Sequence, residues 1–418
     1  MVVTGVVSAG SGGYSPVMRV MLLGLLGVVA IAASAWWLVG GPGSALDDTA
    51  PIADACAAAT LVPPAPSGDV VRPEVRWAGS ELPADLLRDR LMGMYDVTAW
   101  EGGWVASGST ADVPSRGLVF TSATGRSWTR SPEIEGQFED VELRWLHATP
   151  ERLVMPAAIW PDDLHGAGEV WNSPDGVTWT ASNGQFADGW FSAIGGSADL
   201  LILGAREELG AHAWTSSDGL AWLSQPVELP VPLDNVAFSA VERVGAEWLA
   251  IGQITPRGPA GPSTPAIFRS VDGAAWTCHL LDAAGFERVA PDALHRAARG
   301  WVAMGRGSDI CADLCDSSGI LWTSSDGRTW SRAMVNVGPT RIGGIVYAGS
   351  AIGVLAVGHG TTWWSPTGAE WTELDAGRSA DALRGQPDAM ALTDDGRVAV
   401  VGSISGAWVA YAELTVPD

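Results

Sequence analysis

Short apolar runs that end at or near a glycine return at intervals along the chain. The runs occupy residues 104–108, 153–156, 200–204, 248–252, 301–305, 354–358 and 398–402. The second run ends in Pro156 where the others have glycine. Continuous apolar character over so few residues is typical of a β-strand that is covered on both faces. The pattern therefore predicts an all-β protein made of repeated sheets.

A second pattern, Ser-x-x-Gly-x-x-Trp, lies between these runs and predicts a tight turn. It occurs six times, beginning at Ser122, Ser173, Ser216, Ser270, Ser324 and Ser365. Four copies place Asp before the Gly, and their key residues are Ser173, Asp175, Gly176, Trp179, Ser216, Asp218, Gly219, Trp222, Ser270, Asp272, Gly273, Trp276, Ser324, Asp326, Gly327 and Trp330. Glycine takes a positive φ without steric cost, and an Asp carboxylate accepts backbone N–H bonds in turns. We assign the motif a structural role, with each Trp packed between neighbouring sheets.

The spacing of the turn motif, roughly 40 to 55 residues, is typical of the blades of a β-propeller. The last unit, at about 388–414, carries its inner strands but reaches the end of the chain before an outer strand. Residues 74–77 (Glu-Val-Arg-Trp) can supply that strand, and closing the ring removes two exposed sheet edges. We predict a seven-bladed propeller over residues 74–418, with 74–79 as the outer strand of the last blade. Six blades is the alternative.

With these motifs the chain resembles the Asp-box, or bacterial neuraminidase repeat, β-propellers, a group that includes the sialidases. The family box is usually Ser-x-Asp-x-Gly-x-Thr-Trp, so this chain carries a variant with one residue fewer between Asp and Gly. The resemblance implies that the box is a structural turn on the face away from any ligand. It covers roughly residues 97–413 and is specific for the fold rather than for an activity.

Sialidase chemistry, as the resemblance implies it, uses three arginines that clamp a carboxylate and a Tyr nucleophile with a Glu partner. The candidates for these arginines are Arg144, Arg288, Arg306, Arg341 and Arg384. The family's Arg-Ile-Pro signature is absent, and the nearest string is Arg341-Ile-Gly. Tyr95, Tyr347 and Tyr411 lie in runs typical of buried strands. The resemblance is therefore to a non-enzymatic member of the sialidase-like superfamily.

Charge and motifs narrow the list of partners. The basic residues number 24 and the acidic residues 47, which gives a formal net charge of −23. Such a chain lacks the basic face expected of a nucleic-acid-binding protein. The globular part contains no phosphate loop, dinucleotide fingerprint or zinc-protease motif. We expect no cofactor, no metal and no nucleic acid partner.

The N-terminal region predicts a membrane anchor and a stalk. Residues 1–19 form a short cytoplasmic segment, and residues 20–39 are an apolar run long enough to span a bilayer. Residues 40–73 are rich in Ala, Pro and Gly and predict a disordered linker. The propeller is then extracytoplasmic, on a single-pass anchor. The alternative is a cleaved signal peptide and a secreted protein.

Four cysteines in an exported chain predict disulfide bonds. Cys311 and Cys315 can close a small loop within a long connection, and Cys56 with Cys278 can join the linker to the ring. Metal binding by Cys311 and Cys315 is the rival interpretation of that pair.

Candidate ligand groups lie on the face opposite the turn motifs, where loops project from a rigid scaffold. One loop carries Asp162, Asp163 and His165, a possible ligand set for a divalent ion. The residues directly after the strand glycines are expected at the rim of the central channel, and they are Ser109, Ala205, Gln253, Arg306, His359 and Ser403. Arg306 and His359 belong to adjacent units and form a candidate anion site. The alternative is that all of them are solvated strand ends.

Two function classes follow. The first is a monomeric, membrane-anchored propeller that binds an unknown protein or glycan, or supports assembly, without catalysis. The alternative is a sialidase-like exo-glycosidase or another carbohydrate-active enzyme, which would need three arginines and a Tyr–Glu pair at the channel mouth.

Overall fold

The computed structural model describes residues 56–58, 73–83, 91–110, 116–131, 138, 141–143, 145–162, 165–186, 188–206, 209–230, 236–255, 263–284, 288–308, 318–333, 345–358, 360–375, 383, 386–403 and 407–417. The predicted segments 1–19 and 20–39, and most of 40–73, lie outside these residues. Within the described part of the chain, no helix has the length and apolar character needed to cross a membrane.

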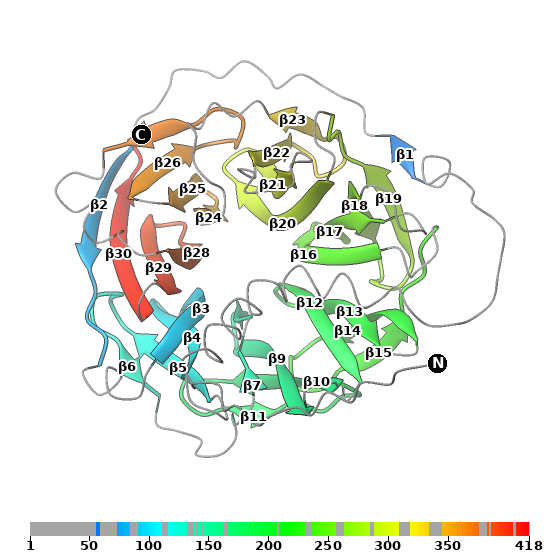
Figure 1. The fold of residues 1–418 in the computed structure, drawn as a ribbon, viewed down its shortest axis with the longest axis horizontal. Helices are drawn as coiled ribbons and strands as arrows, with labels where there is room; N and C mark the ends of the chain where they lie inside the picture. Colours follow the sequence, from blue (N-terminus) through cyan, green and yellow to red (C-terminus); the bar gives the residue numbers. More distant parts are fainter. Residues whose placement is uncertain are drawn as a thin grey trace, which may run out of the picture. The chain divides into compact units, whose positions relative to one another are not determined.

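The described residues form seven sheets that follow one another around a common centre (Figure 1). Blade 1 consists of β3 (Leu91–Trp100), β4 (Gly103–Thr110), β5 (Gly117–Ser122) and β6 (Thr129–Arg130). Blade 2 consists of β7 (Val141–Glu142), β8 (His147–Ala148), β9 (Leu153–Asp162), β10 (His165–Ser173) and β11 (Thr180–Ala181). Blade 3 consists of β12 (Gly189–Gly196), β13 (Leu200–Arg206), β14 (Gly210–Ser216) and β15 (Leu223–Pro226). Blades 4 and 5 consist of β16 (Val236–Val244), β17 (Glu247–Ile254), β18 (Thr264–Ser270) and β19 (Trp276–Leu280); and β20 (Arg288–Ala297), β21 (Gly300–Ser308), β22 (Ser318–Ser324) and β23 (Ser331–Ala333). The protein is an all-β, seven-bladed propeller, which confirms the predicted fold class over the six-bladed alternative.

The last two blades contain the ring closure. Blade 6 consists of β24 (Ile345–Ser350), β25 (Gly353–Gly358), β26 (Thr361–Ser365) and β27 (Thr372–Leu374). Blade 7 consists of β28 (Pro387–Leu392), β29 (Arg397–Ser403) and β30 (Ala407–Thr415) together with β2 (Glu74–Gly79). Strand β2 pairs antiparallel with β30, from Glu74↔Thr415 to Gly79↔Ala410. Trp77 of β2 is only 3% exposed, and its indole N–H donates to the Thr362 hydroxyl of blade 6 at 3.1 Å. The N-terminal strand therefore completes the final blade and packs on the blade before it.

The six Ser-x-x-Gly-x-x-Trp segments are turns between the third and fourth strands of their blades. Their glycines all have φ between 70° and 79°. In the third blade the Ser216 hydroxyl accepts the Gly219 N–H at 2.9 Å. The Asp218 carboxylate accepts the N–H groups of Leu220 and Ala221 at 2.9 and 3.1 Å. These backbone bonds hold the pKa of Asp218 below its usual value.

The turn tryptophans form the contacts between blades. Trp128, Trp179, Trp222, Trp276 and Trp330 are 1–5% exposed, and Trp371 is half-buried. In five of the six turns the indole N–H donates to the carbonyl of the turn glycine, at 2.9–3.2 Å. A buried indole hides roughly 150–250 Å² from water, so these residues supply much of the packing between neighbouring sheets.

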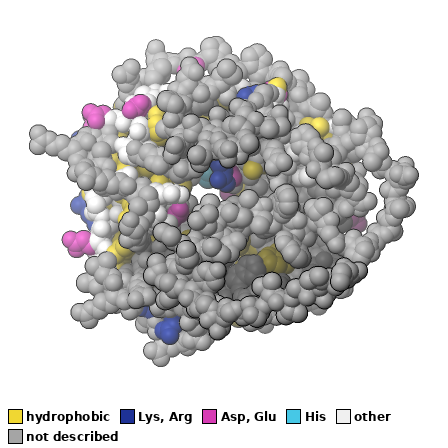
Figure 2. Space-filling model, in the orientation of Figure 1, with side chains coloured by type: hydrophobic (Ala, Val, Ile, Leu, Met, Phe, Trp, Pro, Cys, Tyr) yellow, Lys and Arg dark blue, Asp and Glu magenta, His cyan; other side chains and the backbone are white. Residues whose placement is uncertain are grey.

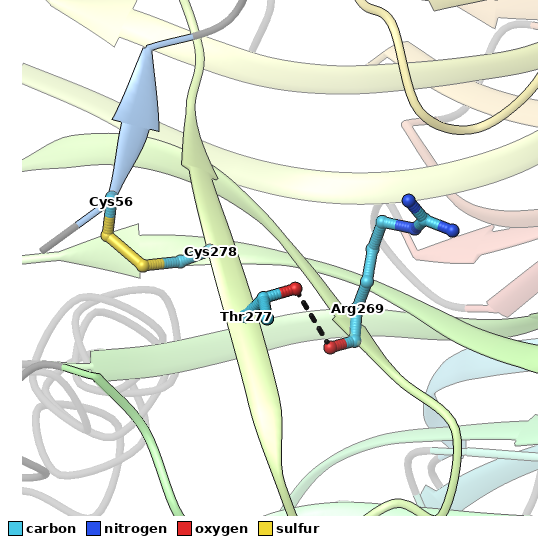
Figure 3. The surroundings of a disulfide bond; sticks show 4 residues. All are labelled: Cys56, Arg269, Thr277 and Cys278. Carbon is cyan, nitrogen blue, oxygen red and sulfur yellow. Dashed lines mark hydrogen bonds between the residues drawn. A yellow bond between two sulfur atoms is a disulfide. The ribbon is translucent and has the colours of Figure 1, made fainter.

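A disulfide bond joins the N-terminal segment to blade 4. Cys56 and Cys278 are bonded, and they are 2% and 3% exposed. The next two residues form β1 (Ala57–Ala58), which pairs parallel with β19 as a fifth strand of that blade. Figure 3 shows Cys56 beside β19, with Thr277 of the same strand bonded to the Arg269 carbonyl. Cys311 and Cys315 lie outside the described residues.

Replacing Cys56 and Cys278 together by Ala should lower the free energy of unfolding by about 5 kcal/mol, because a long closed loop restricts the unfolded chain. The two cysteines are 222 residues apart in sequence. Denaturation by guanidinium chloride, with and without a reductant, measures the change. The matched control replaces Cys311 and Cys315 by Ala and should lower the free energy of unfolding by no more than about 2 kcal/mol, because a short loop restricts the unfolded chain less. A wild-type midpoint that does not move in reductant would contradict the prediction.

Candidate functional site

The innermost strands of the blades surround the central opening (Figure 1). Five of these strands are interrupted at the same place by an irregularity of the β-bulge type, where one residue has no partner in the strand register. The extra residues are Tyr95, Ser192, Ser239, Asp292 and Asp388. All five are polar or carry a hydroxyl, and a bulge redirects the side chain of the residue that it adds.

The glycine that ends each apolar run explains why the bulge fits there. A β-carbon on Gly252 would lie 2.2 Å from the carbonyl oxygen of Ala237 on the innermost strand. The glycines of the other four bulged blades, Gly108, Gly204, Gly305 and Gly402, face the equivalent carbonyl oxygen at 1.8–2.9 Å. Only a residue without a side chain allows the two backbones to approach this closely. The repeated glycine therefore permits the local geometry that places polar groups at the opening.

Substitution of Gly252 by Ala should destabilise the propeller by about 2–3 kcal/mol, because the new methyl group meets backbone atoms that cannot rotate away. The comparison is Gly79→Ala, at a position where a β-carbon meets no atom within 4 Å. That variant should stay within about 0.5 kcal/mol of the wild type. Chemical denaturation of both variants measures the difference, and equal stabilities would show that the close approach is not required.

Three of the five bulged side chains bond to the side chain that follows the strand glycine in the same blade. In blade 1 the Tyr95 and Ser109 hydroxyls are 2.8 Å apart. In blade 7 the Ser403 hydroxyl donates to the Asp388 carboxylate at 2.5 Å. In blade 5 the Arg306 guanidinium donates to both carboxylate oxygens of Asp292, at 2.7 and 2.8 Å. We call these three pairs the channel pairs.

The channel pairs of blades 1 and 7 are neighbours. A β-carbon on Gly93 would lie 3.0 Å from the β-carbon of Ser403 and 3.3 Å from the Tyr95 ring. Three hydroxyls and one carboxyl group therefore lie where the last blade joins the first. Burial raises the pKa of Asp388, so this carboxyl holds its proton to a higher pH than an exposed Asp does.

The pair in blade 5 carries opposite charges that remain in contact with solvent. The side chains of Arg306 and Asp292 are 41% and 36% exposed. The bond to Asp292 raises the pKa of Arg306 above its ordinary value. Burial of Tyr347 in blade 6 raises the pKa of its phenol to about 12, and the negative charge of Asp292 adds to this effect. In the space-filling view acidic, basic and histidine side chains gather at the central opening (Figure 2).

The structure brings only some of the sequence-predicted ligand residues to this site. Arg306 belongs to a channel pair, and Gln253 is half-buried at the equivalent position of blade 4, opposite Ala237. Asp162 and His165 are register partners in the pairing of β9 with β10. His359 and Asp163 lie outside the described residues. Among the residues that the structure describes, no three His, Cys, Asp or Glu side chains gather as a metal site requires.

A cleft of about 570 Å³ lies between blades 2 and 3. Its lining includes Phe186 and the ion pair Arg206–Asp188, whose two N–H···O bonds are both 2.9 Å. Glu169 also lines the cleft, but alternate residues of a strand point to opposite faces. Val170 packs with blade 3 and Trp171 with blade 1, so the Glu169 carboxyl lies on the Trp171 face. Of the acidic side chains that line this cleft, only Asp188 is directed to it, and its carboxylate is paired with Arg206.

Tyr95, Asp292 and Asp388 were missed by sequence reasoning. The available signal is a fixed spacing, because each lies 14 or 15 residues before its partner. Tyr95 was expected to be a core residue, but it is half-buried and bonded at the channel. Tyr411 is buried as expected, at 5% exposure. Of the five candidate arginines, Arg306 is in the channel and Arg288 begins β20; Arg144, Arg341 and Arg384 lie outside the described residues.

Comparison with known proteins gives only distant likenesses. No family model and no curated protein sequence matches the chain. Among solved structures, an α-L-arabinofuranosidase from Fusarium graminearum covers 78% of this chain and 93% of its own length, with 11% identity and a TM-score of 0.45. The β-propeller domain of the trilobed protease from Pyrococcus furiosus covers 78% and 98%, with 12% identity and a TM-score of 0.47. A family 43 endo-arabinanase from Bacillus licheniformis covers 58% and 98%, with 11% identity and a TM-score of 0.34. Likeness at this level carries no argument about this chain.

Proposed function

We propose that this propeller is a binding module for a glycan, which it holds at the channel mouth. The observation that carries the proposal is the set of channel pairs, which places hydroxyl, carboxyl and guanidinium groups around one opening. Ligand sites in proteins combine a concave surface with a few convergent polar groups. Sugars present many hydroxyls, and each of these both donates and accepts hydrogen bonds, as the channel pairs require.

The proposal includes the setting of the module. The apolar run 20–39 would anchor the chain in a membrane, and residues 40–73 would hold the propeller on the extracytoplasmic side. In this view the six turns are a shortened variant of the Asp-box, and the turn face has a structural role. A rigid scaffold with variable loops on the opposite face is typical of recognition proteins.

A glycan array probed with the full chain in detergent tests the proposal. We expect a defined set of oligosaccharides to bind, and Arg306→Gln to weaken that binding by about tenfold or more, because it removes charge-assisted hydrogen bonds. The matched control is Arg328→Gln on the turn face, since Arg328 is also paired with an acidic residue, Glu247, and is 62% exposed. Equal loss in both variants, or an array without a signal, would refute the proposal.

A second candidate function, glycoside hydrolysis, is favoured by the two carboxyl groups of the channel pairs. Asp388 has a raised pKa because of burial, whereas Asp292 accepts two hydrogen bonds from the Arg306 guanidinium. Two carboxyl groups in contrasting environments are the usual arrangement for a general acid and its partner. In this reading Asp388 protonates the leaving oxygen while Asp292 takes a proton from the water that attacks the anomeric carbon.

If the propeller is a hydrolase, Asp388→Asn should lower kcat by about 100-fold or more, because the general acid is lost. Activity should fall as the pH rises through the raised pKa of Asp388, since the acid must carry its proton. Release of nitrophenol from a panel of nitrophenyl glycosides measures both effects. Absence of turnover with every substrate, together with retained glycan binding, would leave the binding role alone.

A further inference from the structure

We propose that the Asp292–Arg306 pair makes the channel selective for neutral glycans over acidic ones, with Asp292 as the residue that determines this specificity. The inference rests on the proposed glycan-binding function and names its ligand class. It replaces the anion site expected from Arg306 in the sequence.

The geometry of the pair shows why Arg306 does not act as an anion receptor. A guanidinium binds a carboxylate best through two parallel N–H···O bonds. Arg306 already makes that contact within its own blade, through Nε and Nη2 to the two oxygens of Asp292. A ligand carboxylate would have to displace a partner that is part of the protein. The remaining N–H groups of the guanidinium can still donate to hydroxyl oxygens, which need only one bond each.

The charges around the pair act in the same direction. Arg306 and Asp292 together have no net charge, and the nearby Tyr347 phenol has a pKa of about 12. Asp388 is the further acidic group in the channel pairs, and its Ser403 partner is uncharged. The whole chain has a net charge of −23, which repels anions at long range. An anionic sugar therefore meets no unmatched positive charge among the channel pairs.

Blade 3 contains a second ion pair of this form. Arg206 makes the same two bonds to Asp188, which lies directly before the innermost strand β12, whereas Asp292 is the bulged residue inside β20. Arg206 is 18% exposed and lies in the cleft between blades 2 and 3. The blade 5 pair differs because both members are well exposed at the channel.

The experiment compares four forms of the full chain: wild type, Asp292→Asn, Asp388→Asn and the double variant Asp292→Asn with Arg306→Gln. The probes are immobilised neutral hexose oligosaccharides, oligosaccharides of the same length that end in glucuronate, and inorganic phosphate. We expect the wild type to bind the neutral set. Asp292→Asn should gain glucuronate and phosphate binding by about tenfold or more, because it releases one charged donor.

The two other variants separate a freed guanidinium from a change in net charge. Asp388→Asn also removes a carboxyl group from the channel but frees no arginine, so it should gain no phosphate binding. The double variant should lose the gain. Wild-type preference for glucuronate, or an equal gain in both single variants, would overturn the inference. If neither glycan set binds any form but Asp292→Asn still gains phosphate, the proposed glycan function fails and the role of Asp292 in masking Arg306 stands.

Discussion

The sheets of this ring are stable only against one another, because apolar side chains cover both faces of each blade. Trp104 and Met94 of blade 1 pack with Val401 and Tyr411 of blade 7, and both tryptophan and methionine are at most 1% exposed. Similar clusters join the other blades, with the turn tryptophans among their largest members. Burial of this kind makes a polar group between the blades costly unless it finds a partner, as the Trp77 indole does in the Thr362 hydroxyl.

Polar side chains that meet a ligand must therefore lie at the centre or on the two faces. On five of the innermost strands a bulge adds one polar residue and redirects its side chain. The channel pairs then satisfy most of these polar atoms internally, and Arg306 with Asp292 is the clearest case.

A feature of this protein could be predicted from the sequence when the residues that produce it lie close together along the chain. The apolar runs and the glycine turns lie within a few consecutive residues, so the fold class could be inferred without a structure. The channel pairs join residues across a strand and a turn, and the bulge that aligns them leaves no mark on the apolar pattern. Gly252 illustrates the difference. The sequence predicts that it ends a strand, but the close approach of the Ala237 carbonyl, which explains why a glycine is needed there, became visible only in the structure.

The sequence predicts an anion site at Arg306 and His359, and His359 lies outside the described residues. The acidic partner of Arg306 could not be identified in the same way. Asp292 lies on the previous strand, 14 residues earlier, and becomes its partner only through the antiparallel pairing of β20 with β21. Electrostatic expectations from a single sequence are weakest where opposite charges are matched across strands.

The covalent bond at Cys56 determines how mechanical load enters the propeller. Tension applied to the chain ahead of this residue would be transferred to β19, because the bond meets the chain before β2 does. Strands β1 and β2 lie on opposite sides of the ring (Figure 1). The pairing of β2 with β30 would thus carry no tension, because blade 4 would bear the force. A tethered propeller would therefore resist separation of β2 from the last blade.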